Sequence, residues 1–320
     1  TKEKQRMIQQ VLEEAIVYAS EFTYLGRSAS YIPELAKSNP AQLGACIVTT
    51  DGDCYCSGDW RQPFTMQSIS KTISLILALQ TAGEACVFSK VGVEPTGDAF
   101  NSIVQLETKS KRPPNPLINA GAIAVISCIK GEDRWGRLLS LARRLCRRNS
   151  IELDEAVYRS ERSTGMRNRS IAYFMQSEHL IEGDVEEDLD LYFKICSLSV
   201  TAQDLANYGM ILANDGVDPA NGECLVENGI LRIVKTLMVT CGLYDGSGEF
   251  AVNVGIPSKS GVGGGIVSAA EGKMGIGVFS PGLDAKGNSI GGYRMLEYIS
   301  KHLNLHYFAD RDTQKNLKGV

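Results

Sequence analysis

The chain is short of the residues that mark several common classes of protein. It has only three histidines and two tryptophans, and no apolar run is long enough to cross a bilayer. It begins with charged, helix-forming residues rather than a secretory leader. A net charge of −4 gives no overall attraction to nucleic acid or anionic lipid. We therefore expect a soluble cytoplasmic protein with no nucleic-acid or membrane partner.

Familiar catalytic signatures are also missing. The chain has no Gly-x-Ser-x-Gly elbow and no visible Ser-His-Asp set. His302 and His306 lie four residues apart near the end of an expected helix, a spacing that could bind a metal. Because no cluster of carboxylates or thiols accompanies them, a helix C-terminal cap is the better interpretation. The sequence thus indicates neither a histidine base nor a metal centre.

The nine cysteines form no Cys-x-x-Cys pair, and their number is odd. Most lie in apolar runs, which is typical of small buried side chains and of a reducing compartment. In the strand expected over 53–58, alternation places Cys54 and Cys56 on one face, without further metal ligands.

The most informative stretch is 64–83, where Ser68 and Lys71 form Ser-x-x-Lys at the mouth of an apolar helix. A spacing of three places both side chains on one helical face. A serine hydroxyl becomes a good nucleophile when a base takes its proton, and a buried lysine can be that base because burial lowers its pKa. Ser127 and Lys130 form a second such pair, but Lys130 is more simply a cation near a helix C-terminus. The motif alone is therefore weak evidence for catalysis.

The periodicity predicts strands at both ends of the chain and helices between them. An amphipathic pattern predicts a helix over 3–20, and alternating runs predict strands over 43–49, 53–58, 249–255, 264–270 and 274–279. Residues 84–118 look irregular, 119–241 look helical with a capping box at Thr201 to Asp204, and 290–305 form a last helix. We expect an α/β (α+β) fold: an antiparallel sheet from residues 1–83 and 242–320, covering helices, and an inserted all-α domain over 84–241. The active site is expected between the two parts.

Six arginines between 134 and 148 alternate with apolar residues at helical spacing. Such a pattern is more typical of the solvated face of an amphipathic helix than of an RNA-binding surface.

A second motif, Lys259-Ser-Gly261, leads into a glycine-rich segment that ends at Gly265. Glycines allow a ligand to approach the backbone, although a strained turn between strands gives the same pattern. With Ser-x-x-Lys, this order resembles the penicillin-recognising serine enzymes. Their intermediate motif, Ser-x-Asn or Tyr-x-Asn, is absent, which argues against a β-lactamase or transpeptidase.

Longer segments resemble the serine-dependent glutaminase family of bacterial type. They are 65–72 (TMQSISKT), 94–101 (EPTGDAFN), 113–123 (PPNPLINAGAI), 160–168 (SERSTGMRN) and 259–265 (KSGVGGG). The resemblance covers nearly the whole chain from Tyr31. It implies a β-lactamase-like fold, hydrolysis of L-glutamine to L-glutamate and ammonia, no cofactor, and a homo-oligomer, either a dimer or a tetramer.

The resemblance also implies roles for individual residues. Ser68 matches the nucleophile and Lys71 its base, while Tyr244 is expected to relay a proton. The residues that match the substrate-binding positions are Tyr31, Ser68, Asn119, Glu161, Asn168, Tyr192, Tyr244 and Val262, the last through its backbone N–H. Lys259 is expected to give electrostatic support.

These residue types suit a zwitterionic substrate. Glu161 can bind an α-ammonium group, and amide or tyrosine donors can bind an α-carboxylate. Taken singly, each has an ordinary structural explanation: a bridging asparagine, a surface ion pair or a core tyrosine. Three alternatives stay open: a penicillin-interacting carboxypeptidase or esterase, a non-catalytic ligand sensor, and an asparagine-specific amidase.

Overall fold

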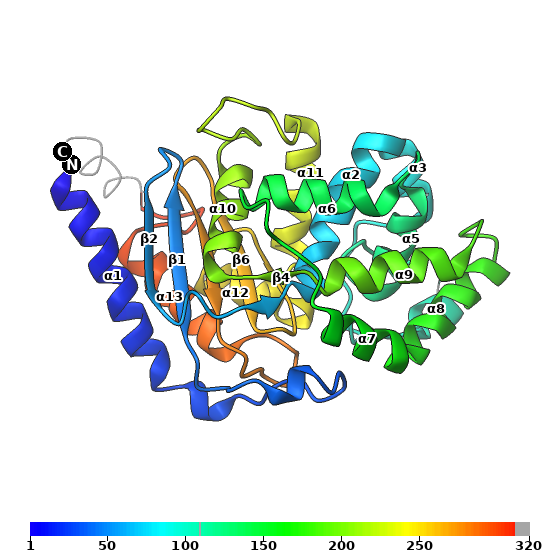
Figure 1. Ribbon diagram of the computed structural model, residues 1–320, viewed down its shortest axis with the longest axis horizontal. Coiled ribbons are helices and arrows are strands. Elements are labelled where there is room, and N and C mark those ends of the chain that lie inside the picture. The colour runs from blue at the N-terminus through cyan, green and yellow to red at the C-terminus, as the bar shows by residue number, and fades with distance from the viewer. Residues whose placement is uncertain (109, 311–320) are drawn as a thin grey trace.

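A five-stranded antiparallel sheet built from both ends of the chain forms one side of the molecule (Figure 1). The computed structural model describes residues 1–108 and 110–310. The strand order is β2-β1-β7-β6-β5, with bounds β1 Gly44–Thr49, β2 Cys54–Gly58, β5 Ser258–Ser260, β6 Gly265–Ala270 and β7 Met274–Phe279. The expected α/β class and the origin of the sheet in both chain ends are confirmed.

Helices cover both faces of the sheet. On one face α1 (Lys2–Ser20) packs along α13 (Ile290–His302), and on the other α10 (Ala202–Ala213) packs against β6 and β7. The backbones of α10 and β7 come so close that a methyl group on Gly275 would lie 1.9 Å from the backbone nitrogen of Met210. At its N-terminus α10 has the expected capping box of Thr201 and Asp204.

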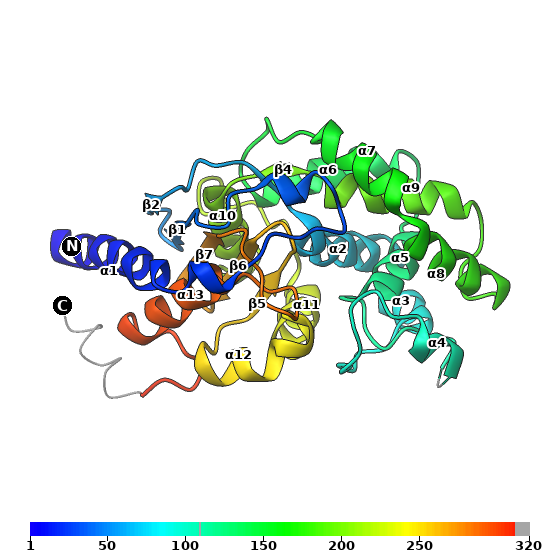
Figure 2. The same ribbon diagram turned by 90° about the horizontal axis from the view of Figure 1, so that it is seen from below.

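The other helices gather beside the sheet around α2 (Ser70–Ala82), whose residues 70–79 are all buried (Figures 1 and 2). A buried hydrogen bond of 2.6 Å between the hydroxyls of Thr72 and Tyr208 joins α2 to α10. The remaining helices are α3 Glu84–Lys90, α4 Val104–Thr108, α5 Asn119–Cys128, α6 Arg134–Leu145, α7 Glu155–Thr164, α8 Met166–Ser177, α9 Val185–Cys196, α11 Asn228–Cys241 and α12 Ser247–Asn253. The boundaries of the two parts expected from the sequence stay a prediction.

One expected strand is wrong. Residues 249–253 belong to helix α12, and the strand that completes the sheet is the short β5. Phe250 and Val254 are buried while Val252 between them is 75% exposed. Because positions i and i+4 lie on one face of a helix as well as of a strand, these few apolar residues could not separate the two.

Two further expectations need correction. The segment 84–118 is not wholly irregular, since it contains α3 and α4. A small two-stranded sheet of β3 (Phe64–Thr65) and β4 (Ser199–Val200) was also missed. Strands of two residues are too short to show an alternating pattern.

The arginines of α6, and those just after its end at Leu145, are held by partners within the chain. Arg134 pairs with Asp188 at 2.7 Å and Arg148 with Asp204 at 2.7 Å, both largely buried carboxylates. Arg147 pairs with Asp218 at 3.3 Å, and Arg143 donates to the carbonyl of Ile151. These contacts anchor α6 to neighbouring elements.

The cysteine pattern indicates a reducing compartment and predicts no disulfide, but two of the cysteines are paired. Cys46 of β1 and Cys56 of β2 face each other across the two strands and form a disulfide. Both lie in strands that the sequence predicted, over 43–49 and 53–58, but the odd number of cysteines gave no sign of the pairing. Over residues 1–108 and 110–310, no helix combines the length and apolar character needed to span a bilayer; the cytoplasmic location stays a prediction.

Candidate active site

Ser68 and Lys71 meet at the start of α2. Ser68 lies in a 3₁₀ turn, Gln67–Ile69, and Lys71 lies in the first turn of the helix. The Nζ atom of Lys71 donates to the Ser68 hydroxyl at 2.9 Å. The structure therefore joins the two groups directly, although the α-helix begins at Ser70 rather than at Ser68.

The backbone before Ser68 is strained. Gln67 has a φ of 50°, a left-handed conformation that is uncommon outside glycine. Its side chain is buried and donates to the Thr65 hydroxyl at 2.9 Å, which fixes it beneath the turn. A fixed turn of this kind presents Ser68 in one orientation.

Lys71 is 1% exposed, and burial lowers its pKa to about 8. Its Nζ atom also donates to Oδ1 of Asn119 at 2.7 Å. Nδ2 of Asn119 in turn donates to Oδ1 of Asn168 at 3.0 Å. A single hydrogen-bonded chain thus runs from the Ser68 hydroxyl through the amine to the two amides, each on a different element.

Glu161 of α7 is the buried acid of the site. Burial raises its pKa to about 8, opposed by a hydrogen bond from the Ser197 hydroxyl at 3.0 Å and by the charge of Lys71. Burying an ionised carboxylate without an ion-pair partner costs free energy. A cationic group that binds beside Glu161 would therefore stabilise the ionised form of this side chain.

Tyr244 lies on the other side of Ser68. It has a φ of 50°, and among the described residues its buried hydroxyl has no hydrogen-bond partner of normal geometry. Burial raises the pKa of Tyr244, and the nearby Ser68 hydroxyl opposes that rise. Nζ of Lys259 lies 4.4 Å from the centre of the Tyr244 ring and donates to the carbonyl of Ser260 at 2.6 Å. Lys259 is fully buried, and burial together with the charge of Lys71 lowers its pKa well below the usual value.

The loop between β5 and β6 brings Val262 beside the nucleophile. A methyl group on Gly261 would lie 2.8 Å from the carbonyl oxygen of Met66 and 3.3 Å from the backbone nitrogen of Ser68. Within the described part of the chain the Val262 N–H has no acceptor. Because Gly261 has no side chain, its backbone can lie against the turn of Met66 and Ser68. This contact leaves the free N–H of Val262 close to Ser68.

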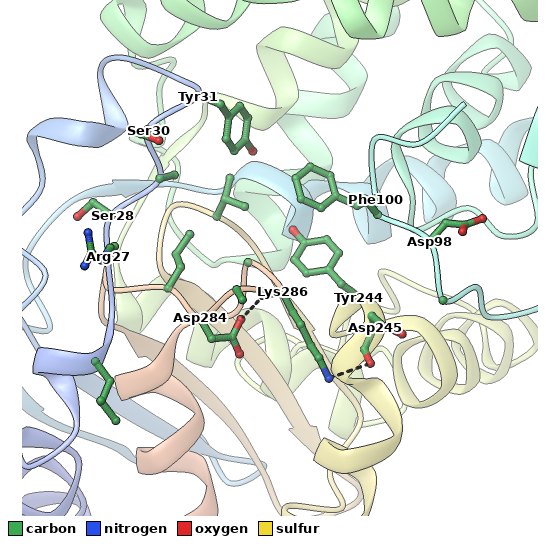
Figure 3. Close-up of a pocket in the computed structure, with 18 residues that line it drawn as sticks. Arg27, Ser28, Ser30, Tyr31, Asp98, Phe100, Tyr244, Asp245, Asp284 and Lys286 are labelled. Carbon is green, nitrogen blue, oxygen red and sulfur yellow. Dashed lines mark hydrogen bonds between the residues drawn. The ribbon is translucent and has the colours of Figure 1, made fainter. Parts of the chain in front are cut away.

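A cavity of about 700 Å³ opens over this region and is lined by Tyr31, Phe100, Tyr244 and Val262 (Figure 3). Tyr31 as a whole is 52% exposed, but its hydroxyl points into the cavity, where burial raises its pKa. The Phe100 ring lies 4.9 Å from that of Tyr244 and 5.9 Å from Nζ of Lys71. Tyr192 of α9 is buried close to Glu161 and Tyr31, and burial raises its pKa as well.

The structure thus gathers every expected site residue in one region, and it adds two that sequence reasoning missed. Phe100 belongs to a segment that resembles the family, but a single aromatic residue in a loop carries no pattern. Ser197 follows the end of α9 and likewise has no signal in the sequence. The second Ser-x-x-Lys pair lies elsewhere: the Ser127 hydroxyl donates to the carbonyl of Ala124.

The chain is similar to known proteins over nearly its whole length. A family model described as Glutaminase matches residues 26–308. Glutaminase 2 from Clostridium perfringens (strain 13 / Type A) is 53% identical over 301 residues, which cover 93% of this chain and 99% of that protein.

Solved structures are similar over the same length. A probable glutaminase, ybaS, has a TM-score of 0.90 at 38% identity, covering 95% of this chain and 98% of the other. A probable glutaminase from Bacillus subtilis complexed with 6-diazo-5-oxo-L-norleucine has a TM-score of 0.85 at 37% identity, covering 93% and 95% of the two chains.

Proposed function

The chain belongs to the glutaminase family, a group of amidohydrolases, and on that premise we propose that it hydrolyses L-glutamine through an acyl-enzyme on Ser68 with Lys71 as the base. Its fold is the β-lactamase-like fold of the glutaminases. The observation that carries the proposal is the 2.9 Å contact between Nζ of Lys71 and the Ser68 hydroxyl. Burial lowers the pKa of this amine to about 8, which makes its neutral form accessible.

In the proposed complex the substrate lies with its amino-acid end toward Glu161. The ionised carboxylate binds the α-ammonium group, while Asn119, Asn168 and the hydroxyls of Tyr31 and Tyr192 serve the α-carboxylate. This assignment is supported by the raised pKa of Glu161, because a cationic partner lowers the cost of its burial. The compound named in the Bacillus subtilis complex is itself an L-α-amino acid with a reactive group at the end of its side chain.

The chemistry then proceeds by two acyl transfers. Neutral Lys71 takes the proton of Ser68, and Oγ attacks the side-chain amide carbon of glutamine. The N–H groups of Ser68 and Val262 stabilise the oxyanion. Lys71 returns the proton to the leaving nitrogen through the hydroxyl of Tyr244, ammonia departs, and water hydrolyses the γ-glutamyl ester. Buried Lys259 keeps the Tyr244 ring in place and adds positive potential when it is protonated.

The test combines turnover with the site of acylation. Glutamine and asparagine are supplied side by side, and release of ammonia and of the free acid is followed. The enzyme is then incubated with 6-diazo-5-oxo-L-norleucine, and the labelled residue is located by mass spectrometry. We expect turnover of glutamine and a label on Ser68. Hydrolysis of asparagine alone, acylation by a β-lactam, or binding of glutamine without product would each favour one of the three alternatives.

The resemblance also leads us to propose a homo-oligomer, either a dimer or a tetramer. Light scattering on the full chain, coupled to size-exclusion chromatography, tests it. A monomeric mass at concentrations that support full activity would contradict this proposal and leave the proposed reaction untouched.

A further inference from the structure

Three cysteine sulfurs lie together at the edge of the sheet, away from the catalytic cavity. Cys46 of β1 is opposite Cys56 of β2, and the two form the disulfide described above. Cys54 lies two residues before Cys56 on the same face of β2, and its Sγ atom is 3.7 Å from Sγ of Cys56. A free thiol therefore lies close to one end of a disulfide.

The three sulfurs differ in their access to solvent. Cys46 is fully buried under α10, Cys56 is partly buried, and Cys54 is exposed. A dissolved thiol or disulfide can therefore reach Cys54 but not Cys46. This order of exposure follows from the position of β2, which is an edge strand, beside β1, which has neighbours on both sides.

We propose that Cys54 is a thiol–disulfide exchange site for small disulfides, through which the Cys46–Cys56 bond is formed and broken. In the reduced protein the Cys54 thiolate attacks a small disulfide and forms a mixed disulfide, releasing one small thiolate. The Cys56 thiolate then attacks Sγ of Cys54 and releases the second small thiolate. Finally the Cys46 thiolate attacks Sγ of Cys56, and Cys54 leaves as a thiolate. One small disulfide is reduced to two thiols while one protein disulfide forms, and reduction follows the same steps in reverse.

Strand geometry explains which protein disulfide persists. Residues two apart on a strand point to the same face, so their Cβ atoms lie about 6.6 Å apart, well beyond the roughly 3.5–4.5 Å of a disulfide. Cys46 and Cys56 are direct partners across the strands, a position in which Cβ atoms lie only about 4.5–5.5 Å apart. The Cys54–Cys56 bond is therefore a short-lived intermediate, and the Cys46–Cys56 bond is the product.

The surroundings of Cys54 have opposing effects on its ionisation. Nε2 of Gln203 donates to its sulfur at 3.4 Å, and Arg147 lies near enough to favour the thiolate. Partial burial has the larger effect and raises the pKa of Cys54, so exchange is expected to be fastest in mildly alkaline solution.

The test follows oxidation of the reduced full chain by oxidised glutathione in mildly alkaline solution, with alkylation at intervals and peptide mass spectrometry. We expect glutathione on Cys54 first and the Cys46–Cys56 disulfide afterwards. Cys224 is an internal control, because it is exposed but its sulfur lies 3.5 Å from the carbonyl oxygen of Val226. A carbonyl cannot displace glutathione, so the mixed disulfide on Cys224 should persist while that on Cys54 disappears.

Two variants make the outcome decisive. Cys54→Ser removes the entry thiol from an exposed position, and we expect the Cys46–Cys56 bond to form about ten- to a hundredfold more slowly, because oxidised glutathione must then react directly with the partly buried Cys56. Cys56→Ser should leave glutathione stably attached to Cys54. Glutamine hydrolysis should be the same in the oxidised and reduced proteins. Formation of the bond at the wild-type rate in Cys54→Ser, or failure of wild-type Cys46 and Cys56 to pair at all, would overturn the proposal.

Discussion

Nζ of Lys71 lies 2.9 Å from the hydroxyl of Ser68, and both groups are almost completely buried. The amine is further fixed by Oδ1 of Asn119 at 2.7 Å, on a separate helix. Two elements thus hold one proton acceptor against one alcohol, which is the arrangement that general-base activation of a serine requires.

The first prediction uses the second Ser-x-x-Lys pair as its control. Ser68→Ala should lower kcat for glutamine at least about a thousandfold, because the variant has no atom to acylate. Ser127→Ala, which removes a serine from the same motif in α5, should leave kcat within a factor of about two. Circular dichroism establishes that both variants are folded. Comparable kcat values for the two variants would exclude Ser68 as the nucleophile.

The second prediction concerns pH. Lys71 must be neutral and Glu161 ionised, and both forms accumulate as pH rises through about 8. We therefore expect kcat/KM for glutamine to rise with pH below this value, with a logarithmic slope between one and two. In Glu161→Gln the slope should fall toward one, because only Lys71 still titrates. A flat profile below pH 8 would contradict the proposed ionisation states.

The third prediction tests what Glu161 recognises. Glu161→Gln should lower kcat/KM for glutamine by about 30- to 150-fold, or about 2–3 kcal/mol, since a charge-assisted contact is lost. The same variant should hydrolyse glutaramate, which lacks the α-amino group, about as well as the wild type does. Glu155→Gln, at an exposed position of the same helix, is the matched control. Equal losses on both substrates would mean that Glu161 does not bind the α-ammonium group.

The fourth prediction concerns the contact between Gly261 and the turn of Ser68. A methyl group there collides with the carbonyl of Met66, so Gly261→Ala should displace the Val262 N–H. We expect kcat to fall by about tenfold to a hundredfold with a smaller change in KM, as for a weakened oxyanion contact. Gly229→Ala in α11, where no atom lies within 4 Å of the added methyl, should change neither constant. A larger effect on KM than on kcat would point to substrate binding instead.

The fifth prediction concerns Asn288, a buried residue that links β5 to the residue before Tyr244. It accepts a hydrogen bond from the Ser260 hydroxyl at 2.7 Å and donates to the carbonyl of Leu243 at 2.9 Å. Asn288→Ala should lower the free energy of unfolding by about 1–3 kcal/mol and also lower kcat, because the Tyr244 turn loses its anchor. Asn253→Ala, which removes an exposed hydrogen bond to Tyr293, should change stability by less than about 0.5 kcal/mol. Unchanged kcat in a destabilised Asn288→Ala would limit that residue to a structural role.

Much of the fold was readable because its elements are long and periodic. The amphipathic helix at the N-terminus and the strands at 44–49, 265–270 and 274–279 lie within a few residues of their expected places. The errors fall where a segment is short. Phe250 and Val254 satisfy helix and strand spacing equally, so the choice between them depended on packing that only the folded chain supplies.

The site was predictable in a different way. The spacing of Ser68 and Lys71 alone implied their contact, whereas Asn119, Glu161 and Tyr192 entered only through resemblance, because they come from separate helices. Phe100 and Asn288 were not found at all. Their contacts depend on how loops and strands approach one another in space, and nothing in local periodicity reports such an approach.

The close contact of Gly209 and Gly275 has a consequence for how this enzyme can vary. A methyl group on Gly275 would lie 1.9 Å from the backbone nitrogen of Met210 in α10, and one on Gly209 would lie 2.2 Å from the carbonyl oxygen of Ser268 in β6. The hydrogen bond between the hydroxyls of Tyr208 and Thr72 then links the position of α10 to that of α2, four residues after the nucleophile. In a library that randomises positions 209 and 275 and selects for growth on glutamine as nitrogen source, survivors should retain glycine at both, although neither residue is near the substrate.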